Sequence, residues 1–341
     1  MSVLLLMAGL SLLVLVVADL LWTTLWVDGS AGPVSRRLST VLWRAMLHAF
    51  RGHARILSLA GPIILTATLL AWVGLLWAGW TLLFAGEPGA LIDTRDPEAV
   101  TWSGRIFFVA NAIFTMGNGD FRPRDGGWQL VTSAATASGM LAVTLAVSYV
   151  LSVLSAVNVK RAFARGVTGL GTASHDFVRH GWDGKDLTAL DPVLASLQSQ
   201  LGQLVEQHRA YPILHYYHCQ EGGDSAAWAV AILDEALTMM QYAVPPEARP
   251  NQALLQNTAS SVERYLATLR SVHIEPADAS PPRPRLEDLT GLGIAGLDRG
   301  RFERALSARD ERRRALAGML QADGWSGPPS DPGRARGSAA S

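Results

Sequence analysis

Charged residues are scarce in this sequence, which is unusual for a soluble protein. Only 17% of the 341 residues are Asp, Glu, Lys or Arg, whereas soluble domains average about 25%. Acids and bases balance to a net charge of zero, which argues against a nucleic-acid partner because such proteins carry a basic surface. A single cysteine, Cys219, excludes an intrachain disulfide and fits a reducing compartment. No Ser-His-Asp, kinase or hydrolase motif stands out, so we expect no enzymatic activity and no catalytic residues.

Three long apolar runs occupy the first half of the chain. They cover residues 2–27, 57–85 and 128–157 and hold one acid and no base between them. Each reaches the roughly 20 residues that a helix needs to cross a bilayer. The first run lacks a basic start and is longer than a signal-peptide core, so we expect a retained transmembrane helix over residues 1–28. The sequence therefore predicts an all-α membrane protein with three transmembrane helices.

The distribution of basic residues predicts the orientation. Arginines cluster in residues 29–56, and Lys160, Arg161 and Arg165 follow the third run, whereas the 86–101 loop is acidic. By the positive-inside rule, the N-terminus and the 86–127 segment face outside. The C-terminal half is then cytoplasmic.

Residues 29–56 predict a basic amphipathic helix at the membrane interface. Leu38, Val41, Leu42, Ala45 and Ala49 alternate with basic residues at helical spacing, a pattern typical of helices that lie on anionic lipid headgroups. The residues expected to face lipid are Arg37, Arg44, Arg51 and Arg55. The alternative is a solvated helix that packs on the C-terminal domain.

Asp19 is an acid inside the first apolar run, and such residues suggest a function by default. It lies near the predicted cytoplasmic end of its helix, beside Trp22 and Trp26. We therefore expect it to snorkel to the interface or to pair with a neighbouring arginine.

The segment between the second and third runs is predicted to enter the membrane and return. Residues 101–114 are too apolar for an external loop, and the segment is too short to cross twice. Backbone of this kind is tolerated at membrane depth only inside protein or beside water. The next residues, "TMGNGD" at 115–120, contain two glycines that can turn backbone carbonyls toward a cation.

These residues resemble the pore module of prokaryotic two-transmembrane-type potassium channels. The resemblance covers a pore domain over 57–160, with an outer helix at 57–85, a pore helix at 101–114, a filter at 115–120 and an inner helix at 128–158. Thr115, Gly117, Gly119 and Asp120 match the filter motif, while Met116 replaces the usual Val or Ile and Asn118 the usual Tyr or Phe. The resemblance implies a homotetramer in the bacterial cell membrane that passes potassium through backbone carbonyls, without a cofactor.

Other positions of the module also match. Phe107, Phe108 and Asn111 occupy places where the family supports its filter, and Gly139 lies where many members have an inner-helix hinge. Thr144, Ser148, Ser152 and Ser155 share one helical face and are expected to line the pore, or else to mediate helix packing or bond their own backbone. Because Asn118 is smaller than Tyr, we expect weaker discrimination against sodium. The alternative function is a non-conducting membrane-anchored sensor or scaffold with a pore-like fold.

The C-terminal half is predicted to be a small all-α domain over 170–273. Helical patterns begin at Asp191-Pro192, at residue 225 and at Pro250. Residues 274–341 are expected to form a proline-rich linker, one charged helix over 298–322 and a disordered tail.

No cofactor or metal site is expected in this half. Two glycine patterns, from Gly169 and from Gly291, follow no strand and so lack the context of a dinucleotide site. His208, His215, His218 and Cys219 match no standard zinc spacing and are expected to belong to a core or a subunit contact.

Overall fold

The structure is a computed structural model that describes most of the chain. It leaves out Met1, residues 27–30, 51–53, 96–99, Asn118, Gln220, residues 271–274, Arg285, Leu292, Ala295, Gly324 and residues 326–341. Arg51, the filter residue Asn118 and nearly all of the tail predicted to be disordered thus lie outside the described residues. The chain divides into two compact units, one of residues 1–45, 62–154 and 210–213, and the other of residues 46–61, 155–209 and 214–341.

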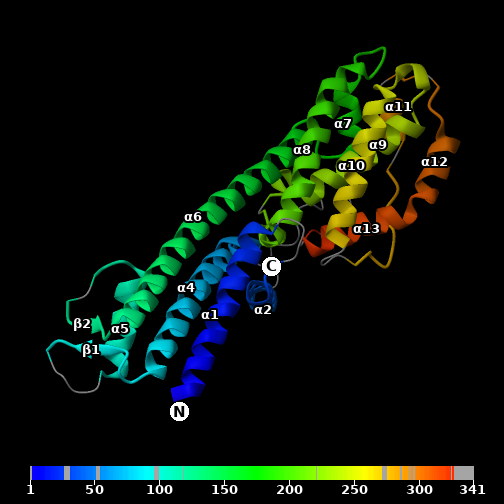
Figure 1. The fold of residues 1–341 in the computed structure, drawn as a ribbon. Coiled ribbons are helices and arrows are strands. Elements are labelled where there is room, and N and C mark those ends of the chain that lie inside the picture. Colours follow the sequence, from blue (N-terminus) through cyan, green and yellow to red (C-terminus); the bar gives the residue numbers. More distant parts are fainter. Residues whose placement is uncertain are drawn as a thin grey trace. The chain divides into compact units, whose positions relative to one another are not determined.

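Three helices are long and apolar enough to cross a membrane. They are α1 (Ser2–Leu25), α4 (Ala60–Gly86) and α6 (Gly126–Thr168) (Figure 1). These helices and the largely helical remainder confirm the predicted all-α membrane fold. The inner helix α6 differs from its prediction, because it continues ten residues beyond residue 158.

Helices α1 and α4 lie side by side and touch through glycines (Figure 1). A Cβ atom added to Gly9 would lie 2.7 Å from the backbone nitrogen of Leu83 and 2.8 Å from the carbonyl oxygen of Gly79. A Cβ atom on Gly79 would meet Leu13 at 2.9 Å. Small residues permit this close backbone approach, which supplies the packing attraction that apolar lipid cannot.

Asp19 is fully buried and caps another helix, which corrects the expectation of snorkelling or arginine pairing. Its carboxylate accepts hydrogen bonds from the Val34 backbone (2.7 Å), from the backbone and hydroxyl of Ser35, and from Trp72 Nε1 (2.8 Å). Val34 and Ser35 begin α2 (Pro33–Ala49), whose N-terminus carries free N–H groups and a partial positive charge. The N-terminus of α2 therefore pairs with Asp19 in place of the expected arginine.

The basic segment forms two helices instead of one. Helix α2 is followed by the short α3 (Ala54–Leu57). Ser35 and Ser39 are buried, whereas Arg37, Arg44 and the predicted apolar residue Val41 are exposed. Arg55 of α3 is exposed as well. Part of the apolar stripe therefore faces outward beside the arginines.

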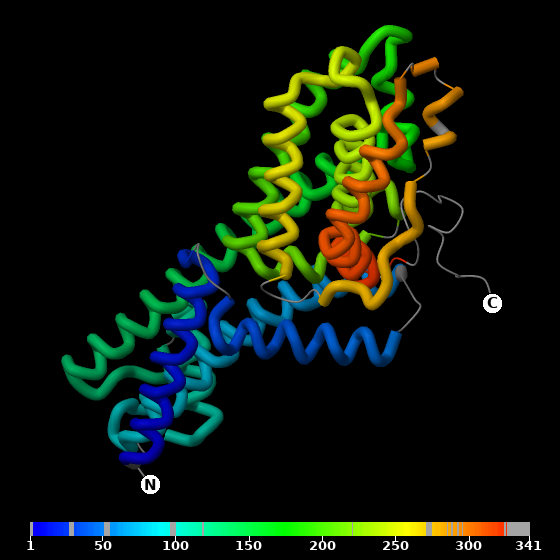
Figure 2. Tube along the Cα trace, turned by 90° about the vertical axis from the view of Figure 1, so that its right-hand side faces the viewer, coloured from blue at the N-terminus to red at the C-terminus, as the bar shows by residue number. Residues whose placement is uncertain are grey.

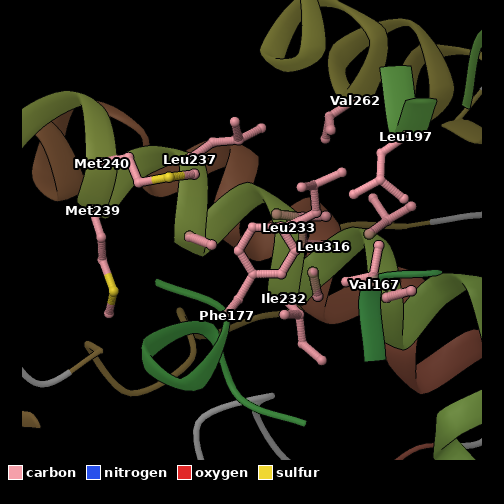
Figure 3. Packing of buried hydrophobic residues seen from close by; sticks show 14 of the residues in the cluster. Val167, Phe177, Leu197, Ile232, Leu233, Leu237, Met239, Met240, Val262 and Leu316 are labelled. Carbon is pink, nitrogen blue, oxygen red and sulfur yellow. The ribbon is translucent and has the colours of Figure 1, made fainter. Parts of the chain in front are cut away.

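The C-terminal domain is a bundle of helices. Its described elements are α7 (Ser174–Gly181), α8 (Asp191–Ala210), α9 (Ala226–Tyr242), α10 (Gln252–Arg270), α11 (Glu287–Thr290), α12 (Arg299–Ala308) and α13 (Asp310–Ala322), with short 3-10 turns at Thr188–Leu190, Pro212–Tyr216, Gly222–Asp224 and Pro246–Ala248. Helix α9 is buried along its whole length from Ala226 to Met240. It forms the centre of the core, and Figure 3 shows its side chains among those of the surrounding helices: Ile232, Leu233 and Leu237 of α9, Val167 of α6, Phe177 of α7, Leu197 of α8, Val262 of α10 and Leu316 of α13.

The end of the described chain belongs to this core, which differs from the expected linker and single charged helix. Residues 299–322 form two helices, and Phe302, Leu306, Leu316 and Met319 are buried in the common cluster. The proline-rich segment that precedes these helices in the chain lies alongside α13 (Figure 2). There the Ala277 backbone N–H donates to the carbonyl of Arg314 (2.9 Å). Most of the charges that suggested a solvated helix lie on the outer faces of α12 and α13, whereas Arg313 is buried.

The close contact of α1 with α4 gives a prediction. Replacing Gly9 by Val forces the two backbones apart, and overpacking of this kind costs about 1–3 kcal/mol. The unfolding temperature of the detergent-solubilised protein should therefore fall. Ala8 is exposed on the same helix, so Ala8→Val adds more than a methyl group of volume without a clash and is the matched control. Equal unfolding temperatures for the two variants would contradict the contact.

Candidate functional site

A short helix, α5 (Trp102–Ile113), leads into the glycine-containing segment, close to the predicted bounds of 101–114. Thr101 caps it, since its hydroxyl accepts from the Gly104 backbone N–H (3.2 Å). Helix α5 is tied to α4 by Trp77, whose Nε1 donates to the carbonyl of Ile106 (2.9 Å). The Thr101 cap and the Trp77 hydrogen bond thus fix the position of α5, and with it the start of the glycine-containing segment.

The two phenylalanines of α5 have different surroundings. Phe108 is buried and packs edge-on against Phe84 of α4, with ring centroids 5.3 Å apart. Phe107 is half exposed, and its ring centroid lies 6.4 Å from that of Phe121 beyond the filter. The predicted aromatic support is thus divided between the outer helix and the far end of the filter segment.

The filter segment has an alternating backbone. Thr115 has φ +55° and Gly117 has φ +76°, while Met116 between them is outside the left-handed region. For a β-branched residue such as Thr this conformation is a true outlier, of the kind that costs about 1–3 kcal/mol and is found at functional sites. Alternation of left- and right-handed conformations lets successive peptide groups face the same side, whereas in a β-strand they alternate. The backbone thus has a positive φ at two alternate residues directly after α5.

The start of the filter segment is fixed by α5. The Met116 N–H donates to the Asn111 carbonyl (2.9 Å), and the Thr115 N–H donates to the Ala112 carbonyl (3.2 Å). Asn111 is one of the residues expected to support the filter, and its side-chain amide donates to the Phe107 carbonyl within α5 (2.8 Å). In the described subunit, Asn111 supports the filter through its backbone.

The far end of the filter is held by a small sheet and by Arg95, a contact that the sequence did not indicate. Strands β1 (Leu91–Asp93) and β2 (Phe121–Pro123) pair antiparallel. Just beyond β1, the Thr94 N–H donates to the Asp120 carbonyl (2.8 Å). Arg95 Nη1 lies 3.3 Å from the Asp120 carboxylate. Both ends of the segment are thus attached to structure outside it.

Gly139 on α6 lies directly against the end of α5. A Cβ atom at this position would lie 2.3 Å from the carbonyl oxygen of Ile113. Next to it, Trp80 Nε1 of α4 donates to the hydroxyl of Ser138 (2.9 Å). Close approach is therefore a sufficient reason for glycine here, and the hinge remains a prediction.

The hydroxyl face of α6 is open in the single subunit. Thr144, Ser148 and Ser155 are exposed and Ser152 is half buried, so this face is not used for packing against α1 or α4. The Thr144 hydroxyl donates to the Met140 carbonyl of its own helix (2.9 Å). The face is available for a water-filled path or for another subunit.

The histidine-rich segment of the C-terminal domain does not gather into a metal site. His208 packs edge-on against Tyr265, and burial lowers its pKa to about 3. His218 forms a hydrogen bond through Nδ1 with Asp323 (2.7 Å). Among the residues that the structure describes, no three His, Cys, Asp or Glu side chains are grouped to hold a metal ion.

The contact at Gly139 can be separated from a hinge by a stability measurement. Adding a methyl group in Gly139→Ala should lower the unfolding temperature, because a backbone carbonyl occupies its place. If bending were the only role, alanine would raise helix stability by up to about 1 kcal/mol. Gly74 of α4 has no atom within 4 Å of an added Cβ, so Gly74→Ala is the matched control and should be neutral or stabilising. A stabilising Gly139→Ala would contradict the contact.

The chain is similar to known membrane proteins. Residues 64–156 match a family described as ion channel. Over 315 residues the chain is 44% identical to "Uncharacterized membrane protein YdjJ" of Bacillus subtilis (strain 168), with 92% of each chain covered. No solved structure matches the chain. The chain therefore belongs to the family of membrane proteins that includes the Bacillus subtilis protein YdjJ, with a pore module of the ion-channel type that two-transmembrane potassium channels share.

Proposed function

We propose that the protein is a homotetrameric cation channel that passes potassium ions through the carbonyl groups of residues 115–118. The observation that carries the proposal is the alternating backbone at Thr115, Met116 and Gly117. Carbonyl oxygens directed to one side can replace the hydration shell of a monovalent cation. A strained backbone of this kind is kept only where its surroundings determine it, as α5, β1 and β2 do here.

The tetramer follows from the number of ligands. One chain supplies one filter segment, and a ring of carbonyls around an ion needs several copies related by rotation. The apolar side chains of α6 that are exposed in the single subunit include Met140, Val143, Val147 and Leu151. Residues of this type on a membrane helix contact lipid or neighbouring helices, which suits packing of subunits around an axis.

The topology proposed from charge places the C-terminal domain in the cytoplasm of a bacterial cell. The exposed residues Arg37, Arg44 and Arg55 then lie at the inner membrane surface, which carries anionic lipids. The N-terminus and the loop that holds Arg95 and Asp120 face outside.

Selectivity depends on how firmly the carbonyl ring is held. The Thr94 and Arg95 contacts fix the outer end at Asp120, but an asparagine at position 118 offers no ring for packing against Phe107. We propose that the filter prefers potassium but discriminates against sodium less strongly than relatives with Tyr at this position.

Ion flux tests the proposed channel. Liposomes that contain the purified tetramer should take up rubidium or potassium, and barium should block the uptake. Gly117→Ala should abolish the flux because alanine is strained at φ +76°. Gly126→Ala, at a position with open space around it, is the matched control and should conduct. Folded tetramers without flux, even after removal of residues 170–341, would favour a non-conducting sensor or scaffold.

The effect of Asn118 is tested by reversal potentials between potassium and sodium solutions. Asn118→Tyr should shift the reversal potential toward stronger potassium preference, because a ring can pack beside Phe107. Asn118→Gln keeps an amide without a ring and should leave the potential near its original value. Strong sodium exclusion by the unmodified channel would contradict this argument.

A further inference from the structure

The C-terminal helical domain contains a cavity of about 140 Å³. It lies between α9, α13 and the proline-rich segment that precedes α12 in the chain. Its apolar walls include Ala231 of α9, Leu316 and Leu320 of α13, Pro281 and Pro282, and Trp325. An apolar cavity of about 150 Å³ holds a molecule of the size of benzene. The space therefore suits a compact ligand.

Two buried ionisable side chains also line the cavity. Glu235 of α9 is 6% exposed and Arg313 of α13 is 5% exposed. The Ser174 hydroxyl of α7 donates to Glu235 Oε2 (3.1 Å). Arg313 Nη2 donates to the carbonyls of Pro281 (2.7 Å) and Pro282 (2.9 Å). These contacts hold both groups at the cavity wall and attach the proline-rich segment over it.

The guanidinium of Arg313 is not fully satisfied by these contacts. Its Nε is buried without a hydrogen-bond partner in the described part of the chain. A buried donor that stays unpaired costs about 1–3 kcal/mol, and more on a charged group. A carboxylate is the acceptor that matches a guanidinium best, in both charge and planar geometry.

Glu235 neutralises the charge of Arg313 less than a surface glutamate would. Burial raises the pKa of Glu235 to about 7, although Arg313 and the Ser174 hydroxyl act in the other direction. Near neutral pH a large fraction of this carboxyl group is therefore protonated and can donate a hydrogen bond. An incoming anion then finds a cation and a second donor in the same cavity.

We propose that this cavity binds a small monocarboxylate with a compact apolar body, of about the size of benzoate. Its carboxylate accepts from Arg313 and Glu235, and its body packs against Pro281, Pro282 and Leu316. The site is independent of ion conduction, so binding can be measured whether or not the protein passes ions.

Calorimetric titration of the full-length protein in detergent with sodium benzoate tests the proposal. We expect one site per subunit, with benzamide at least tenfold weaker because it lacks the charge, and acetate at least tenfold weaker because it lacks the apolar body. This comparison requires no variant. Absence of benzoate binding, or equal affinity for benzamide, would overturn the proposal.

A variant pair locates the site. Ala317 lines the cavity, so Ala317→Leu should fill it and abolish binding, while Ala317→Ser should keep the affinity within about threefold. Circular dichroism confirms that both are folded. Unchanged benzoate binding by folded Ala317→Leu would show that the ligand binds elsewhere and would reject this cavity.

The pH dependence tests the part of Glu235. The charged groups around it are Arg313 of α13 and Asp234 of α9, and Asp234 pairs with Arg312 of α13, which lies 4.0 Å from Glu263 of α10. Ionised Glu235 repels the ligand and neutral Glu235 donates to it, so affinity should fall about tenfold from pH 6 to pH 8 for a group that titrates near 7. Glu235→Gln should remove this dependence. A dependence that persists in Glu235→Gln would contradict the role of this residue.

Discussion

Backbone N–H and C=O groups outside helices and sheets are costly in apolar surroundings unless other parts of the protein or water satisfy them. The pore module is shaped by this constraint. Residues 115–117 belong to no helix or strand, so the chain on both sides must fix their backbone. Here α5 fixes the start through Asn111 and Ala112, while Thr94 and Arg95 fix the end. The close contact at Gly139 presses the inner helix against the same point. Each of these contacts holds one end of the segment at residues 115–120 or packs beside it.

Local patterns were sufficient to predict the long apolar helices and the short helix α5, whereas the filter stays a prediction. Long apolar runs, a threonine cap and a glycine motif are properties of neighbouring residues, and the structure places the helices and the short helix α5 near the expected bounds. Contacts between distant residues were not predictable in this way. Asp19 caps a helix fifteen residues away, and Arg95 reaches Asp120 across a loop. Likewise, α12 and α13 carry many charges, and only the fold shows that their apolar side enters the core.

Glycines have different structural roles at different positions of this chain. Gly117 has a positive φ that other residues adopt with strain, whereas Gly9 and Gly139 have little room for a side chain because another backbone lies against them. Gly74 has open space around it and no such requirement. A sequence motif identifies the first kind, since the spacing reflects a local conformation. The second kind depends on a neighbouring helix and becomes visible only in three dimensions.

The length of α6 determines how much of it can lie inside a membrane. Its 43 residues rise about 65 Å, roughly twice the thickness of the hydrocarbon layer. It is continuous from the filter side to the C-terminal domain, where the Lys160 ammonium donates to the carbonyls of Leu214 and Tyr217. A helix of this length that crosses the hydrocarbon layer once has about half of its residues outside that layer.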